Sequence, residues 1–168
     1  NKNDELNTEY VRPFSGGSRM IQRKKLSPNE VLFGSLLFFA IGSLIGLYIV
    51  YSISWQILLL GIAGVFSGFF YSAPPFKLGS RGLGELIVGL NFGILMSLGA
   101  FFVQTRVWSL EAAVIAIPVS LLIAAVLYIN EFPDYTADKA VGKNTLVVKL
   151  NKNRAIIGYQ IIMWLTFI

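Results

Sequence analysis

Three oxygen-bearing side chains, Asn130, Asp134 and Asp138, stand four residues apart in a polar segment that directly follows a long apolar run. On a helix this spacing places all three along one face. Carboxylates at a membrane boundary are costly unless a cation meets them. Mg²⁺ is a hard cation that takes oxygen ligands and commonly shares them with a phosphate group. The spacing therefore predicts a Mg²⁺ site, as a diphosphate-using membrane enzyme would need.

A second interpretation of the same acids stays open. The carboxylates could instead cap a helix and pair with Lys139 or Lys143 in a solvated loop, because structural ion pairs also occur at such positions. Pro133 should also disturb the helix just before Asp134, which would bend the common face. The residue types and their spacing favour the metal site.

Three further segments carry cations that could meet a diphosphate. Lys143 lies in a flexible Gly-Lys-Asn-Thr loop, which is not a P-loop because the first glycine of that motif is missing. Arg12 and Arg19 flank a glycine turn whose amides can face an anion. The segment 71–81 adds three more polar groups, on Tyr71, Lys77 and Arg81. Each segment alone could be a basic loop at lipid headgroups, but together they suit a diphosphate leaving group, whose developing charge needs a metal and cations.

The elements that would position these residues are membrane-spanning helices. The chain is 55% hydrophobic and only 14% charged, against about 25% charged in soluble domains. Four uncharged apolar runs approach or exceed the roughly 18 residues of a spanning helix, and a fifth follows near the chain end. The sequence predicts an all-α, polytopic transmembrane helical bundle with helices at about 31–52, 54–72, 84–104, 110–130 and 155–168.

The charges predict how this bundle is oriented. All but one of the 14 lysines and arginines fall in segments that alternate onto one side, and only Arg106 falls on the other. This asymmetry predicts an integral cell-membrane protein whose polar loops are cytoplasmic. The net charge of +5 is thus a topology signal, and we expect no nucleic-acid partner. The absence of cysteine and histidine excludes disulfides, thiol nucleophiles and histidine-based catalysis.

Small residues within the apolar runs predict close helix packing. Glycines pair at four-residue spacing in three of the runs, at Gly42/Gly46, Gly64/Gly68 and Gly89/Gly93. Asn91 either makes an interhelical hydrogen bond or lines a cavity, and both alternatives stay open.

The motifs together resemble the UbiA-type membrane prenyltransferases. Asn130-x-x-x-Asp134-x-x-x-Asp138 with the Gly142-Lys143-x-Thr145 that follows is similar to the second aspartate-rich motif of that family. Arg12-Pro-Phe-Ser-Gly-Gly is similar to the segment after its first motif. Tyr71-Ser-Ala-Pro-Pro and Arg81-Gly-Leu-Gly-Glu85 resemble the branch that prenylates 1,4-dihydroxy-2-naphthoate in menaquinone synthesis.

The resemblance implies a nine-helix bundle, of which residues 1–168 would be a partial domain with about five helices, inactive on its own. It implies Mg²⁺-dependent transfer of an isoprenyl group from a polyprenyl diphosphate to an aromatic acceptor in the lipid bilayer. Asn130, Asp134 and Asp138 would hold the metal, with Asp4 as a loosely assigned last acid of the first motif. The diphosphate would meet the side chains of Arg12, Lys77, Arg81, Lys143 and Tyr71. The alternative from another class is a multispanning transporter or channel, although the ionisable residues lie at helix ends rather than near the midplane.

Overall fold

The protein is a row of antiparallel helices. The computed structural model describes residues 20–168, and these contain no strand, which confirms the all-α bundle. The helices are α2 (Pro28–Ser52), α3 (Ile57–Ser72), η1 (Leu78–Ser80), α4 (Gly84–Gly89), η2 (Leu90–Leu95), α5 (Met96–Thr105), α6 (Leu110–Ile115), α7 (Ile117–Ala140) and α8 (Leu146–Thr166). Three segments of the described chain are long and apolar enough to cross a membrane, namely Pro28–Ser52, Gly84–Thr105 and Leu110–Ala140. Ile57–Ser72 is apolar but shorter.

Two helices run further than the apolar runs indicate. α7 does not end near residue 130 but continues through Pro133 to Ala140, with Gly142 in a left-handed conformation (φ 72°) just beyond. A proline removes one backbone donor from a helix, and the rest of the last turns still form in α7. α8 begins at Leu146 rather than near residue 155, because Thr145 caps it by accepting the Val148 N–H. Asn151 (φ 61°) interrupts its helical geometry, where the polar start of α8 meets its apolar part.

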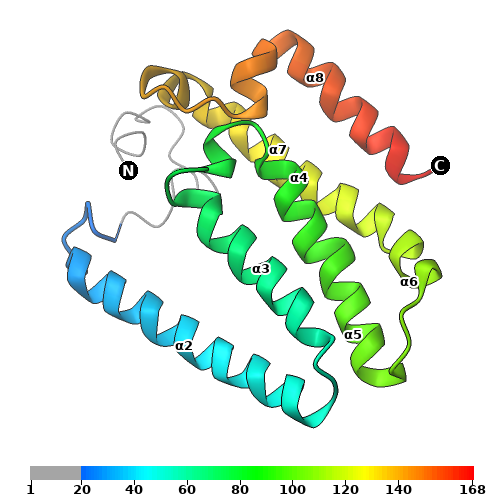
Figure 1. The fold of residues 1–168 in the computed structure, drawn as a ribbon. Coiled ribbons are helices and arrows are strands. Elements are labelled where there is room, and N and C mark those ends of the chain that lie inside the picture. The colour runs from blue at the N-terminus through cyan, green and yellow to red at the C-terminus, as the bar shows by residue number, and fades with distance from the viewer. Residues whose placement is uncertain (1–19) are drawn as a thin grey trace.

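The chain order of the helices is also their order in space, from α2 at one edge to α8 at the other (Figure 1). α7 packs against α4 on one side and α8 on the other. Residues 20–27, which lead into α2, and the connecting segments 73–83 and 141–145 lie at one end of the row (Figure 1). At the opposite end the Arg106 guanidinium donates to the Ile53 carbonyl and joins the two loops there. The positively charged segments of the described chain are therefore collected at one end.

The contact of α4 and η2 with α7 depends on glycine. A Cβ placed on Gly93 would lie 2.5 Å from the Cα of Ser120, and one on Gly89 would lie 2.8 Å from the Ser120 carbonyl oxygen. The predicted close approach is therefore present at this pair. A Cβ on Gly42, Gly46, Gly64 or Gly68 would meet nothing within 4 Å, so those pairs make no close contact within the described residues.

A polar contact ties α3 to the π-helical turn η2. The Ser67 hydroxyl donates to Asn91 Oδ1 at 2.9 Å, and Asn91 Nδ2 donates to the Ile87 carbonyl at 2.7 Å. Asn91 therefore makes an interhelical hydrogen bond, which confirms the first of the two alternatives that the sequence left open.

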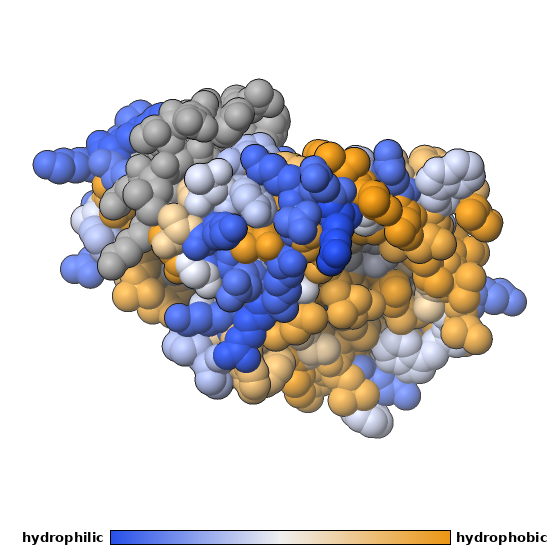
Figure 2. Space-filling model, turned by 90° about the horizontal axis from the view of Figure 1, so that it is seen from above, coloured by the Kyte–Doolittle hydropathy of each residue, from blue (hydrophilic) through white to orange (hydrophobic). Residues whose placement is uncertain are grey.

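The buried core lies between α7 and α8, and α2 contributes little to it. Tyr128, Val147 and Ala155 are fully buried together there. α2 buries none of its residues, and between it and α3 runs an apolar groove of about 850 Å³ lined by residues such as Phe38, Gly46 and Phe66. Seen from above, hydrophilic residues gather in the middle of the face while apolar residues cover much of the rest (Figure 2).

Candidate active site

The predicted acidic face exists on the last turns of α7. Because α7 is continuous from Ile117 to Ala140, Asn130, Asp134 and Asp138 follow one another at one-turn intervals on it. Asp138 is completely buried, whereas Asn130 and Asp134 are partly exposed. The helix therefore carries two carboxylates and one amide oxygen at the end of the bundle where the charged loops lie.

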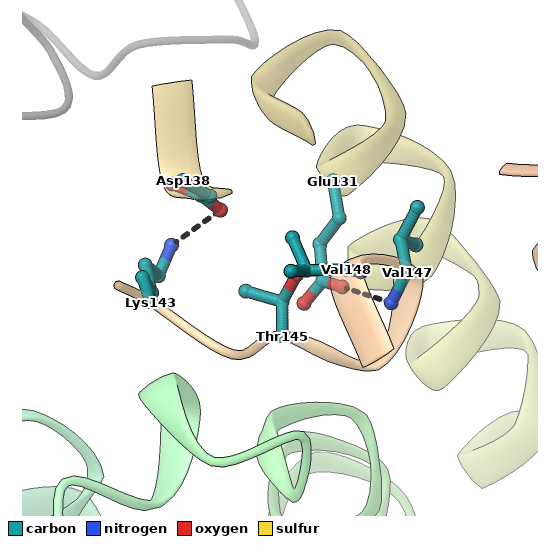
Figure 3. Close-up of polar contacts among 6 residues, drawn as sticks. All are labelled: Glu131, Asp138, Lys143, Thr145, Val147 and Val148. Atoms are coloured by element: carbon teal, nitrogen blue, oxygen red, sulfur yellow. Dashed lines mark hydrogen bonds and ion pairs between the residues drawn. The ribbon is translucent and has the colours of Figure 1, made fainter. Parts of the chain in front are cut away.

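Lys143 returns to this face from the turn that ends α7. Its ammonium group lies 3.1 Å from Asp138 Oδ2, and its backbone N–H donates to the Asp138 carbonyl at 2.9 Å (Figure 3). The positive φ of Gly142 turns the chain back so that this contact can form. The Lys143 side chain remains one-third exposed. This is the Lys143 ion pair that the second interpretation of the acids expected, and it leaves part of the lysine surface open beside a buried carboxylate.

The cationic segment 71–81 is joined to the segment that follows α7 by two hydrogen bonds. The Asn144 N–H donates to the Ser80 carbonyl at 3.0 Å, and the Lys149 ammonium donates to the Arg81 carbonyl. Two loops separated by about 60 residues of sequence are therefore held together at this end of the bundle.

Within segment 71–81, the candidate diphosphate ligands have different environments. Lys77 is exposed and has a left-handed backbone (φ 46°) at the start of η1. Arg81 is also exposed, and its Nη2 donates to the Pro75 carbonyl at 3.0 Å, which closes the loop on itself. Both cations thus lie at the surface of the charged end.

Tyr71 lies beneath this loop. Its ring is so close to Gly79 that a Cβ there would lie 2.7 Å from the ring, and its hydroxyl faces Gly84. Its ring therefore supports the turn that carries Lys77 and Arg81. Two other predicted site residues, Arg12 and Asp4, fall outside the described residues.

The sequence did not single out two buried carboxyl groups behind the acidic face. Glu85 on α4 is 4% exposed and Glu131 on α7 is 7% exposed, and their carboxyl groups interact directly. Glu131 Oε2 also accepts the Val147 N–H at 3.4 Å (Figure 3). The sequence could have indicated these two residues, because each glutamate lies at the edge of an apolar run, where an unpaired charge would be costly.

The donor set fits Mg²⁺ that is shared with a diphosphate better than a metal held by protein alone. No group of three or more histidine, cysteine, aspartate or glutamate side chains within residues 20–168 is arranged to hold a metal ion. Mg²⁺ typically takes one or two carboxylates and completes its shell with substrate phosphates and water. Asp134 and Asp138, with Asn130 one turn before, supply such a partial set on oxygen donors alone.

Comparison with known proteins places this geometry in context. The sequence model of the UbiA prenyltransferase family matches residues 16–168. A Bacillus subtilis (strain 168) protein named 1,4-dihydroxy-2-naphthoate octaprenyltransferase is 31% identical over 136 residues, which is 81% of this chain and 44% of that protein. A Synechocystis protein named 2-carboxy-1,4-naphthoquinone phytyltransferase is 34% identical over 119 residues, 67% of this chain and 38% of that protein. A Haemophilus influenzae 1,4-dihydroxy-2-naphthoate octaprenyltransferase is 30% identical over 92% of this chain and 51% of its own length.

The chain spans about half the length of the curated relatives it matches. No solved structure gives a significant match to it.

Proposed function

The chain belongs to the UbiA prenyltransferase family, and we propose that the protein transfers an isoprenyl group from a polyprenyl diphosphate to an aromatic quinone precursor within the membrane. The observation that carries the proposal is the Asp138–Lys143 pair at the polar end of α7, with Asp134 one turn before it. Carboxylates for a metal and a cation for phosphate oxygens are the two parts that a diphosphate leaving group needs.

The names of the relatives support one acceptor class. Proteins from Bacillus subtilis and Haemophilus influenzae are named for 1,4-dihydroxy-2-naphthoate, and the Synechocystis protein for 2-carboxy-1,4-naphthoquinone. We therefore propose a bicyclic naphthoate-type acceptor and a place in menaquinone synthesis. The apolar groove between α2 and α3, about 850 Å³ in volume, has the lining that an isoprenoid chain needs.

One set of residues in this chain would bind the metal, and another would bind the diphosphate. Asn130, Asp134 and Asp138 would hold Mg²⁺, which when bound neutralises negative charge on the diphosphate. Lys143, Lys77 and Arg81 would contact diphosphate oxygens, with Arg12 added from the segment before α2. The bond between the prenyl carbon and the diphosphate oxygen then breaks, the aromatic carbon bonds to the prenyl carbon, and the ring loses a proton.

The test is prenyl transfer by the complete protein in isolated membranes. Labelled geranylgeranyl diphosphate, Mg²⁺ and a panel of aromatic acceptors are supplied to the wild type and to Asp134→Asn. We expect a lipid-soluble labelled product that requires Mg²⁺ and falls by at least about 100-fold in the variant, the scale on which loss of one electrostatic group acts. Glu111→Gln is the matched control, because Glu111 is exposed on α6 at the opposite end of the bundle.

Two results would contradict the proposal. Full activity of Asp134→Asn would remove the metal role of this residue. A folded wild-type protein that yields no product with any acceptor, and instead moves an ion or solute across vesicles, would favour a transporter.

A further inference from the structure

Glu131 lies next to Asn130 in sequence but belongs to a different face of α7. Consecutive residues of an α-helix are rotated by about 100° about the axis, so Glu131 cannot share the face of Asn130, Asp134 and Asp138. Its side chain instead extends toward Thr145 and Val147 at the start of α8 (Figure 3). It is 7% exposed, which makes it an interior group rather than a surface charge.

The groups that Glu131 meets are those at the first turn of α8. Its Oε2 accepts the Val147 N–H at 3.4 Å, and its carboxyl group also interacts with the Thr145 side chain. The first N–H groups of a helix have no partner within the helix, and a carboxyl oxygen placed there supplies one. Thr145 and Val147 are both almost fully buried, so water does not replace this contact. Glu131 therefore fastens the start of α8 to α7.

Thr145, where Glu131 holds the start of α8, lies two residues after Lys143 in the sequence. The connection from α7 to α8 is the short segment 141–145, held at its beginning by the Val141 N–H on the Ala137 carbonyl and in its middle by the Lys143 N–H on the Asp138 carbonyl. The next residue, Asn144, donates its N–H to the Ser80 carbonyl. Glu131 holds its far end through Thr145 and Val147. The position of the Lys143 ammonium beside Asp138 thus depends on a segment that is held at both ends.

The burial of the Glu131 carboxyl group among other polar groups lowers the stability of the fold. Glu85 from α4 interacts with Glu131, and Glu85 Oε1 has no hydrogen-bond partner within residues 20–168. The buried Tyr128 hydroxyl is likewise unpaired within that part of the chain. Buried polar groups without partners destabilise a fold, and an apolar side chain of similar volume is often neutral or stabilising in such a place. A carboxyl group at position 131 therefore calls for a role beyond packing.

We propose that Glu131 is a positioning residue: by holding the first turn of α8, it sets Lys143 beside the Asp134–Asp138 face for binding the diphosphate. This inference rests on the proposed function, in which Lys143 meets the diphosphate. Glu131 itself touches neither the metal nor the diphosphate.

The direct test compares two substitutions in the complete protein. Glu131→Leu fills the space but accepts no hydrogen bond, whereas Glu131→Gln keeps an oxygen that can accept the Val147 N–H. We expect Glu131→Leu to bind Mg²⁺–pyrophosphate about tenfold more weakly, the equivalent of one hydrogen bond to a charged group. It should also speed amide hydrogen exchange at residues 142–149. In Glu131→Gln, the pyrophosphate affinity and the amide exchange rates should both stay within about threefold of the wild-type values.

A double-substitution cycle decides whether Glu131 acts through Lys143. If it does, Glu131→Leu combined with Lys143→Met should bind pyrophosphate no more weakly than Lys143→Met alone. Additive losses, wild-type binding by Glu131→Leu, or a defect in Glu131→Gln equal to that of Glu131→Leu would each overturn the inference. Pyrophosphate binding and amide hydrogen exchange are both measured without prenyl transfer. A protein that forms no prenyl product would therefore contradict the proposed function, whereas the binding and exchange results alone decide whether Glu131 positions Lys143.

Discussion

At the scale of single residues, the central observation is a cation already in contact with the acid that is expected to hold a metal. Lys143 lies 3.1 Å from the fully buried Asp138, and one-third of its side chain is still exposed. A buried carboxylate is stable only with a partner, and the lysine supplies that partner. The exposed part of Lys143 leaves it able to meet a second anion at the same place.

The first prediction tests this dual contact. Lys143→Met should weaken Mg²⁺–pyrophosphate binding by about tenfold or more, because a hydrogen bond to a charged group contributes about 1.5–3 kcal/mol. Isothermal titration calorimetry of the complete protein measures the affinity. Lys152→Met is the control, since Lys152 is exposed on the same end of the bundle and lies over the Tyr135 ring, 5.2 Å from its centroid. Equal affinities of the two variants would contradict a phosphate contact by Lys143.

At the same scale, the sequence located the acids but not the groups behind them. The four-residue spacing of Asn130, Asp134 and Asp138 was enough to predict a shared face, because helix geometry alone determines it. The contacts of Glu131 with Glu85 and Val147 could not be predicted, since they depend on how α4 and α8 pack against α7. Spacing within one helix is local information, whereas contacts between helices are not.

At the scale of elements, α7 determines both the site and the packing. Apolar runs predicted the helices of the bundle, but hydropathy could not show that α7 continues through Pro133 into its polar last turns. Hydropathy also missed the polar beginning of α8, where the Thr145 cap starts the helix. Helix ends are set by capping and backbone geometry, which the apolar pattern does not record.

The second prediction concerns the contact between η2 and α7. Gly93→Ala should lower the thermal stability of the detergent-solubilised protein, because the new Cβ would lie 2.5 Å from the Ser120 Cα and force the helices apart. Overpacking of this kind typically costs about 1–3 kcal/mol. Gly42→Ala is the matched control, since a Cβ there would meet nothing within 4 Å among residues 20–168, and alanine favours a helix over glycine. A melting temperature of Gly93→Ala equal to that of Gly42→Ala would show that the close approach is not required.

At the scale of the whole molecule, the chain belongs to an integral membrane protein, and the distribution of charge divides its two ends. Apart from the loop of Arg106, the described loops that carry lysines and arginines, including those at Lys77 and Lys143, lie together at one end of the row (Figure 1). Arg106 lies in a loop at the other end and donates to the Ile53 carbonyl there. Clustering of cations on one side is typical of cytoplasmic loops, so we propose that the candidate site opens to the cytoplasm.

The last prediction tests this orientation, and the chain is suited to it because it contains no cysteine. Gln22→Cys places a thiol before α2 at the charged end, and Val107→Cys places one in the loop after α5 at the opposite end; both positions are exposed. In intact cells, a membrane-impermeant maleimide should label the Val107 variant and leave the Gln22 variant unlabelled, in a complete protein whose other cysteines, if any, are replaced. Inside-out vesicles should reverse the result. Labelling of Gln22→Cys in intact cells would place the diphosphate site on the outer face, where a cytoplasmic supply of prenyl diphosphate could not reach it, and would contradict the proposed orientation.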